Sequence, residues 1–126
     1  MQNSELFTSL SKFHLLETVS LDGLKCDFST AFKGVFLVNL RHFVYRNSDR
    51  DIYDPELIVL AQAIPYVESL DFGGTKLTNQ NLKVLLQKCK YVSSLSVLNS
   101  TLMSDLTLQL LSTHVKCLKT IALGGF

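Results

Sequence analysis

Residues 77–97 read LTNQNLKVLLQKCKYVSSLSV, and this stretch decides the fold. Leu82 and Leu85 stand three residues apart, which is the spacing of one face of an α-helix. Further on, Leu95 and Val97 stand two residues apart with serines on either side of Leu95, and this alternation favours a short strand. The stretch therefore predicts a helix that leads directly into a strand.

The strand pattern of this stretch recurs along the whole chain. The spacing apolar-x-x-apolar-x-apolar occurs as Leu16/Val19/Leu21, Leu40/Phe43/Tyr45, Val67/Leu70/Phe72, Val92/Leu95/Val97 and Leu118/Ile121/Leu123. Successive starts lie 24, 27, 25 and 26 residues apart, and leucine supplies 24 of the 126 residues. A nearly constant period of this length is typical of stacked structural repeats.

Helices are expected between the strands. The apolar residues at helical spacing are Leu57, Leu60 and Ile64; Leu82, Leu85 and Cys89; and Leu108, Leu111 and Val115. One recurring position ahead of these helices holds Asp54, Asn79 and Asp105, and Pro55 follows the first of them, so we expect N-caps there. In the first unit Phe28, Phe32 and Phe36 form a helical stripe, but Gly34 predicts a short or distorted helix. Residues 4–12 are expected to be the helix of a preceding, incomplete unit.

These positions resemble the cysteine-containing subclass of leucine-rich repeats. In that subclass a unit reads roughly C-x-x-L-x-x-L-x-L and continues, after a turn, into I/L-T-D-x-x-L-x-x-L. The match covers nearly the whole chain and is closest from Leu77 to Val97, where Cys89 stands at the cysteine position. The resemblance implies an α/β fold: a right-handed leucine-rich-repeat solenoid with parallel concave strands and convex helices. Residues 1–126 are then a single array of about five strands, incomplete at one or both ends.

Composition excludes several classes of protein. Because 47% of the residues are hydrophobic and the formal net charge is only +1, intrinsic disorder is excluded. A charge this small gives no electrostatic footprint for nucleic acid or for an anionic membrane. Apolar runs fall short of the roughly 20 residues that span a bilayer, and the N-terminus lacks the pattern of a signal peptide. The odd cysteine count favours a reducing compartment, so we expect a cytoplasmic protein, with the nucleus as an alternative.

The predicted register identifies the side chains that face outward from the strands. Most of them are small or short and polar, which gives a smooth surface that a partner can approach closely. The candidate partner-binding residues are Asp22, His42, Val44, Arg46, Ser69, Asp71, Ser94, Ser96 and Leu98. Arg46 is the large side chain expected to anchor a partner, since arginine is common among interface hot spots. The alternative is that Arg46 pairs with Asp22 on the neighbouring strand.

The residues that could act in catalysis or bind a metal ion are better explained by structural roles in the core or in turns, so we expect no enzyme, no cofactor and no metal site. Cys89 falls on the core phase and is expected to be an inert buried thiol, whereas Cys26 lies in a loop and is expected to be exposed. His114 and Cys117 are too few ligands for zinc. The glycine pairs Gly73-Gly74 and Gly124-Gly125 are expected to form turns, because neither matches a phosphate-binding loop. The charged segment from Arg41-His42 through Arg46 to Asp51, whose signs alternate toward the end, is expected to be a solvated turn.

The sequence thus predicts a non-enzymatic protein-interaction module that binds another protein through the concave face of the array. The family resemblance implies a narrower alternative, the substrate-recognition part of an F-box type ubiquitin-ligase receptor. Self-association through uncapped repeat ends is a further alternative. Neither nucleic acid nor a membrane is expected as a partner.

Overall fold

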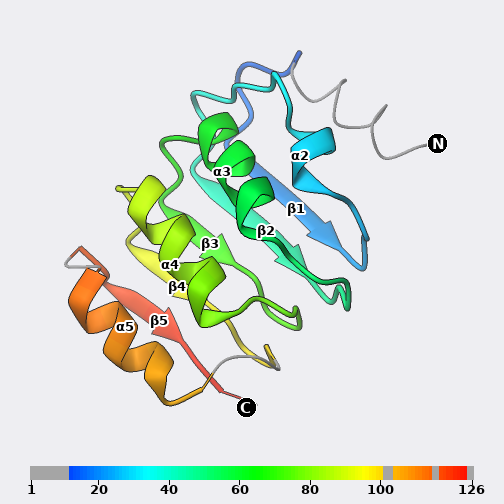
Figure 1. The fold of residues 1–126 in the computed structure, drawn as a ribbon. Helices are drawn as coiled ribbons and strands as arrows, with labels where there is room; N and C mark the ends of the chain where they lie inside the picture. Colours follow the sequence, from blue (N-terminus) through cyan, green and yellow to red (C-terminus); the bar gives the residue numbers. More distant parts are fainter. Residues whose placement is uncertain (1–11, 101–103, 115–116, 125–126) are drawn as a thin grey trace.

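The computed structural model describes residues 12–100, 104–114 and 117–124. Over these residues the chain has an α/β fold with a single sheet of five parallel strands in the order β1-β2-β3-β4-β5. The strands are β1 (Thr18–Asp22), β2 (His42–Arg46), β3 (Ser69–Asp71), β4 (Ser94–Ser96) and β5 (Thr120–Ala122). The four helices described are α2 (Phe28–Ala31), α3 (Asp54–Ala63), α4 (Asn79–Lys88) and α5 (Leu106–His114). Figure 1 shows the helices in a row alongside the row of strands.

Alternation along the strands separates a buried face of the sheet from an open one. Val19, Leu21, Phe43 and Tyr45 are less than a tenth exposed, while the residues between them point the other way. These buried side chains join the apolar side chains of the helices in one core, so the helices cover this face of the sheet. The opposite face, which we call the open face, carries Thr18, Ser20, Asp22, His42, Val44, Arg46, Ser69, Asp71, Ser94, Ser96, Thr120 and Ala122.

Helices α3 and α4 form where the apolar spacing predicts them. Leu57 and Leu60 of α3 and Leu82 and Leu85 of α4 are all fully buried. Each helix packs against the next one along the chain, from α2 to α5. The helical positions predicted from residues 4–11, and from Val115, lie outside the described residues.

A polar residue recurs at the start of the helices, and its side chain forms a hydrogen bond that joins one unit to the next. The prediction that Asp54 and Asn79 cap their helices is wrong, because each is the first residue of its helix and the preceding residue is the cap. Asn81 Nδ2 instead donates a hydrogen bond to Asp54 Oδ1 (2.7 Å), and Thr107 Oγ1 donates one to Asn79 Oδ1 (2.7 Å). Asp105 directly precedes α5.

The first unit has the short helix that the sequence predicts. Helix α2 has only four residues, and Asp27 caps it by accepting a hydrogen bond from the Ser29 N–H (2.8 Å). Phe28 and Phe32 are buried, but Phe36 is 57% exposed, so the predicted stripe of three phenylalanines is wrong at its last member. The reason is that the helix has already ended before Gly34, which turns the chain with φ of 74°.

Turns with left-handed backbone follow the strands at one fixed position of the unit. Gly23, Asn47, Gly74 and Asn99 all have positive φ, between 58° and 72°. The Gly74 N–H continues the parallel pairing by donating to the Leu98 carbonyl (2.8 Å). A Cβ at position 74 would lie 2.6 Å from Asn47 Oδ1, so the backbone conformation favours glycine there and the close approach of Asn47 leaves no room for a side chain.

The last strand is less buried than the strands before it. Ile121 is 39% exposed, whereas Leu70 and Leu95 at the same position of β3 and β4 are at most 1% exposed. Strand β5 pairs with β4 alone, so among the described residues no strand pairs with its other edge. Among the described residues, moreover, none of the helices combines the length and apolar character needed to cross a bilayer.

Candidate functional site

The strand register brings the predicted partner-binding side chains together on the open face. Two rows cross it: Thr18–His42–Ser69–Ser94–Thr120 and Ser20–Val44–Asp71–Ser96–Ala122. Asp22 and Arg46 pair in register and begin a third row at the ends of the strands, and Leu98 follows β4 there. The nine predicted residues therefore share one surface, and their role in binding stays a prediction.

Arg46 is held by an acidic residue, but not by the one that the sequence suggests. Its Nε donates to Asp71 Oδ2 at 2.6 Å, and Nη2 forms a salt bridge with the same oxygen. The hydrogen bond and the charge of Asp71 raise the pKa of Arg46. Asp22 accepts a hydrogen bond from Asn47 Nδ2 instead (2.9 Å). Arg46 thus reaches diagonally to β3, so the proposed pairing with Asp22 is wrong.

Asp71 is fixed from two sides and is only 8% exposed. Its Oδ1 accepts a hydrogen bond from the Gly73 N–H (2.9 Å), while Oδ2 faces Arg46. A Cβ on Gly73 would lie 3.2 Å from Asp71 Oδ1 and 3.1 Å from the Leu98 carbonyl oxygen, so glycine permits this close approach. Arg46, whose side chain is 51% exposed, is therefore presented in a fixed orientation.

A hollow of about 180 Å³ opens beside this pair, where the strands end. Its lining combines the ion pair with backbone of the following turns and one apolar side chain. The lining residues are Arg46, Asn47, Asp71, Gly73, Gly74, Ser96, Leu98 and Asn99. Leu98 is 41% exposed. The hollow is large enough for one side chain of a partner, with an arginine at its edge.

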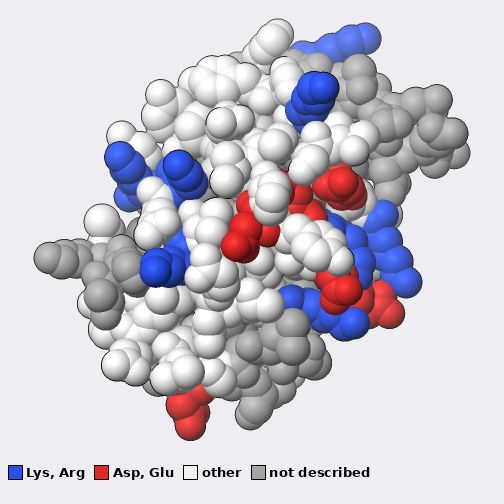
Figure 2. Space-filling model, viewed as in Figure 1, with Lys and Arg blue, Asp and Glu red and all other residues white. Residues whose placement is uncertain are grey.

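Ion pairs continue along the same edge of the sheet, which we call the strand-end edge: the C-terminal ends of the strands with the turns and helix starts that follow. Lys25 pairs with Asp49 (3.0 Å), and Lys76 pairs with Asp51 (3.9 Å). Figure 2 shows blue and red side chains next to each other on the right, where Figure 1 places the ends of β1 and β2. The cations of this edge are therefore already neutralised within the chain.

One ion pair of the strand-end edge is buried. Arg50 binds Glu56 through two hydrogen bonds of 2.5 and 3.0 Å, and its side chain is only 14% exposed. Arg50 also donates to the Tyr45 hydroxyl (3.0 Å), and its guanidinium lies 4.9 Å from the centre of the Phe28 ring. Burial lowers the pKa of Arg50, but its hydrogen bonds to Glu56 and Tyr45 outweigh this and raise it. The prediction of a solvated turn is therefore wrong at Arg50.

The three cysteines differ in accessibility. Cys89 is buried, as predicted, and burial raises its pKa to about 12. Cys26 is also buried, at 4% exposed, so the prediction that it is exposed is wrong. Burial raises the pKa of Cys26, and this outweighs the opposing effects of Arg50 and Tyr45. Because the thiolate is the reactive form, neither buried cysteine is suited to nucleophilic chemistry.

Thiol titration tests this arrangement. With the native protein at neutral pH we expect one fast-reacting thiol per chain, Cys117, because it is the exposed one of the three. All three thiols should react after denaturation, and a Cys117→Ser variant should have no fast-reacting thiol. The measurement is the time course of absorbance with Ellman's reagent. A fast reaction in that variant would contradict the burial of Cys26 and Cys89.

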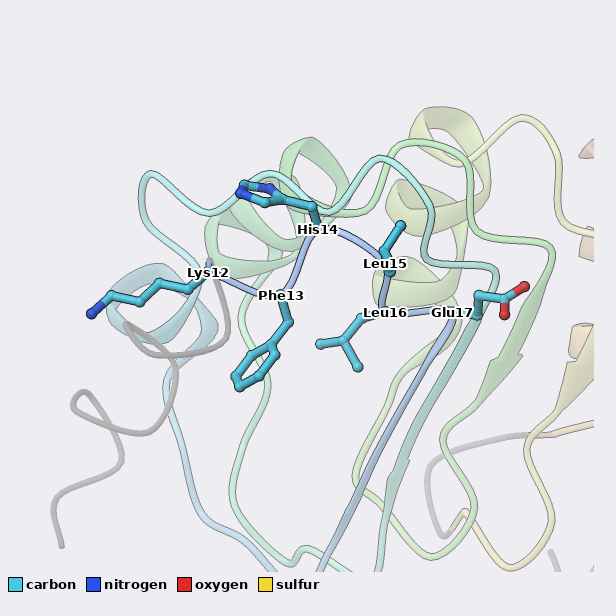
Figure 3. A pocket seen from close by; sticks show the side chains of 6 residues that line it. All are labelled: Lys12, Phe13, His14, Leu15, Leu16 and Glu17. Carbon is cyan, nitrogen blue, oxygen red and sulfur yellow. The ribbon is translucent and has the colours of Figure 1, made fainter.

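A larger hollow, of about 520 Å³, lies along the segment 12–17 that precedes β1. Figure 3 shows Phe13 and Leu16 pointing to the same side of this segment, while His14 and Glu17 point in other directions. A catalytic or ligand site needs polar groups that converge on one point, and the described lining does not provide them. No group of three His, Cys, Asp or Glu residues suited to a metal ion occurs within the described ranges.

Sequence reasoning missed part of the hollow at the strand-end edge. Asn47, Gly74 and Asn99 line it, one residue beyond the last outward position that the repeat predicts. Their shared signal was present in the sequence, because Gly or Asn recurs at this phase and both residue types tolerate positive φ.

No protein-family model matches the chain, and no curated protein matches it either.

Proposed function

We propose that the chain is a leucine-rich-repeat solenoid that binds another protein through its open face. Two features support the repeat assignment. The sheet runs in sequence order with parallel strands, and each helix packs on the next. Residues at equivalent positions also have the same structural role in successive units. Examples are the left-handed turn residues and the hydrogen bonds Asn81–Asp54 and Thr107–Asn79. Such arrays use an extended face for binding.

The observation that carries the proposed function is the Arg46–Asp71 pair beside the hollow. The surrounding open face consists largely of short side chains, among them Ser69, Ser94 and Ser96, which let a partner approach the sheet closely. Arg46 stands out from this surface and is preorganised by Asp71. Preorganised arginines lose little side-chain entropy on binding and are frequent hot spots.

Substitution of Arg46 tests the open face. For a partner identified by cross-linking to the purified chain, we expect Arg46→Ala to weaken binding by roughly tenfold or more, as hot-spot residues do. Asp71→Ala should weaken binding less, because it releases Arg46 without removing it. The measurement is the dissociation constant by calorimetry, with Lys25→Ala as a control on an exposed ion pair outside the open face. Unchanged affinity in both open-face variants would place the binding site elsewhere.

A further inference from the structure

A second surface lies at the opposite edge, where the strands begin and α3 and α4 end; we call it the strand-start edge. Tyr66 and Tyr91 each precede the strand pattern of their unit by one residue, so they stand side by side with ring centroids 5.8 Å apart. They are 40% and 59% exposed. The guanidinium of Arg41 lies 5.8 Å from the centre of the Tyr66 ring. Two tyrosines thus form an exposed ridge across neighbouring units.

An apolar hollow adjoins this ridge. It has a volume of about 240 Å³ and lies between the second half of α3, the residue Pro65 that follows this helix, and the last residue of α4. Its lining residues are Ile58, Ala61, Gln62, Pro65 and Lys88. Ile58 is 38% exposed, although it is a large aliphatic residue. Pro65 of the hollow comes directly before Tyr66 of the ridge in the chain, so the two features adjoin at this point of the backbone. The volume suits one apolar side chain of a partner.

Positive charge without a salt-bridge partner in the described ranges lies on the same edge: Lys88 lines the hollow, Lys90 directly precedes Tyr91, and Lys119 directly precedes β5. Lys88, Lys90 and Lys119 are exposed, and none of them forms a salt bridge among the described residues. Glu68, an acidic residue directly before β3 on this edge, is engaged with Arg41 at 3.4 Å. Figure 2 shows blue side chains without red neighbours on the left, where Figure 1 places the end of α4. This differs from the strand-end edge, whose cations are paired.

We propose that the strand-start edge binds an acidic segment of a partner protein, with one apolar side chain of that segment in the Ile58–Pro65 hollow. Carboxylates of the segment face Lys88, Lys90 and Lys119, and its backbone lies along the Tyr66–Tyr91 ridge. Charge complementarity selects an acidic ligand. A single-stranded nucleic acid fits less well, because bases stack on free ring faces and Tyr66 already contacts both Arg41 and Tyr91. This surface is separate from the open face.

Selection from a displayed library of random linear peptides, with the purified chain as bait, tests the proposal. We expect the selected peptides to carry Asp or Glu on both sides of an apolar residue. Fluorescence anisotropy of the synthesised peptides should show binding about three- to tenfold weaker for Lys88→Gln/Lys90→Gln, the loss expected from two exposed ion pairs. The matched control Lys25→Gln/Lys76→Gln removes the same charge from the strand-end edge and should bind as the unaltered chain does.

Further variants separate the outcomes. Ile58→Glu should abolish binding, because it places a carboxylate in the hollow, and high salt should weaken binding by the unaltered chain. Peptides without acidic enrichment, or equal affinity in the two lysine variants, would overturn the proposal. Oligothymidylate that binds through Lys88 and Lys90 while acidic peptides do not would overturn it in favour of nucleic acid. If Arg46→Ala weakens the binding of the selected peptides, they bind the open face and not this edge, and the proposal is overturned.

Discussion

Replacing Glu56 by glutamine is expected to lower the free energy of unfolding by about 3–5 kcal/mol, the loss typical of breaking a buried ion pair. The side chain of Glu56 is 4% exposed, and it holds both outer nitrogens of Arg50. Without the carboxylate, the Arg50 charge stays buried with no counter-ion. Glu56 also accepts hydrogen bonds from the N–H groups of Tyr53 (3.1 Å) and Phe28 (3.4 Å), so it joins the start of α3 to the first unit. Urea denaturation followed by circular dichroism measures the change.

Two further variants make this prediction specific. Glu68→Gln breaks the exposed Arg41–Glu68 pair and should lower the free energy of unfolding by no more than about 1 kcal/mol. Combining Arg50→Met with Glu56→Gln removes the orphaned charge and should restore much of the lost stability. Equal losses from the Glu56 and Glu68 variants, or no recovery in the double variant, would show that the buried pair does not stabilise the fold in this way.

The order of strands and helices could be predicted from the sequence, because it rests on local apolar spacing. Strands β2 to β4 lie within the predicted pattern, and Leu57 and Leu82 occupy the predicted core positions of α3 and α4. Spacing of this kind is set by helix and strand geometry within a few residues. The register followed as well, since equal phases in successive units place His42, Ser69 and Ser94 in one row.

The polar contacts were harder to predict, because they join residues that are distant in the chain. The charges of residues 46–51 have the pattern of a solvated turn, yet Arg50 is drawn inward by Glu56, by the Tyr45 hydroxyl and by the ring of Phe28. Cys26 is buried for a related reason: its loop is held by the hydrogen bond from Tyr45 to the Leu24 carbonyl (2.7 Å). Such contacts depend on side-chain reach between units, which apolar spacing does not specify.

In the candidate site, too, the positions of the residues could be predicted and their polar contacts could not. The sequence placed Arg46 and Asp71 on one face, but it could not decide which carboxylate Arg46 would bind. The choice depends on Asp71 being locked by the Gly73 N–H and on Asp22 being occupied by Asn47. Both conditions arise in the turns after the strands, where backbone conformation and not hydrophobicity sets the geometry. The sequence therefore predicts which residues share a row on the sheet, but it does not predict which of them form hydrogen bonds or ion pairs with one another.

Replacing Phe28 by alanine is expected to lower the free energy of unfolding by about 3–5 kcal/mol, as for other buried phenylalanines. Phe28 is fully buried, and its ring meets Phe43 and Tyr45 edge-on, with centroids 6.0 and 4.9 Å away. Because α2 has only four residues, its own hydrogen bonds contribute little, and side-chain packing holds the first unit on the sheet. Urea denaturation followed by circular dichroism gives the change in stability.

Phe36 provides the matched control for Phe28. Both belong to the same sequence stripe, yet Phe36 is 57% exposed, so Phe36→Ala should change stability by no more than about 0.5 kcal/mol. Phe28→Leu keeps most of the buried volume and should fall between the two, which keeps the comparison informative if the alanine variant does not fold. Equal losses at positions 28 and 36 would mean that the aromatic cluster does not anchor the first unit. A loss confined to Phe28 would show that this unit depends on its packing against β2, since its short helix cannot support it alone.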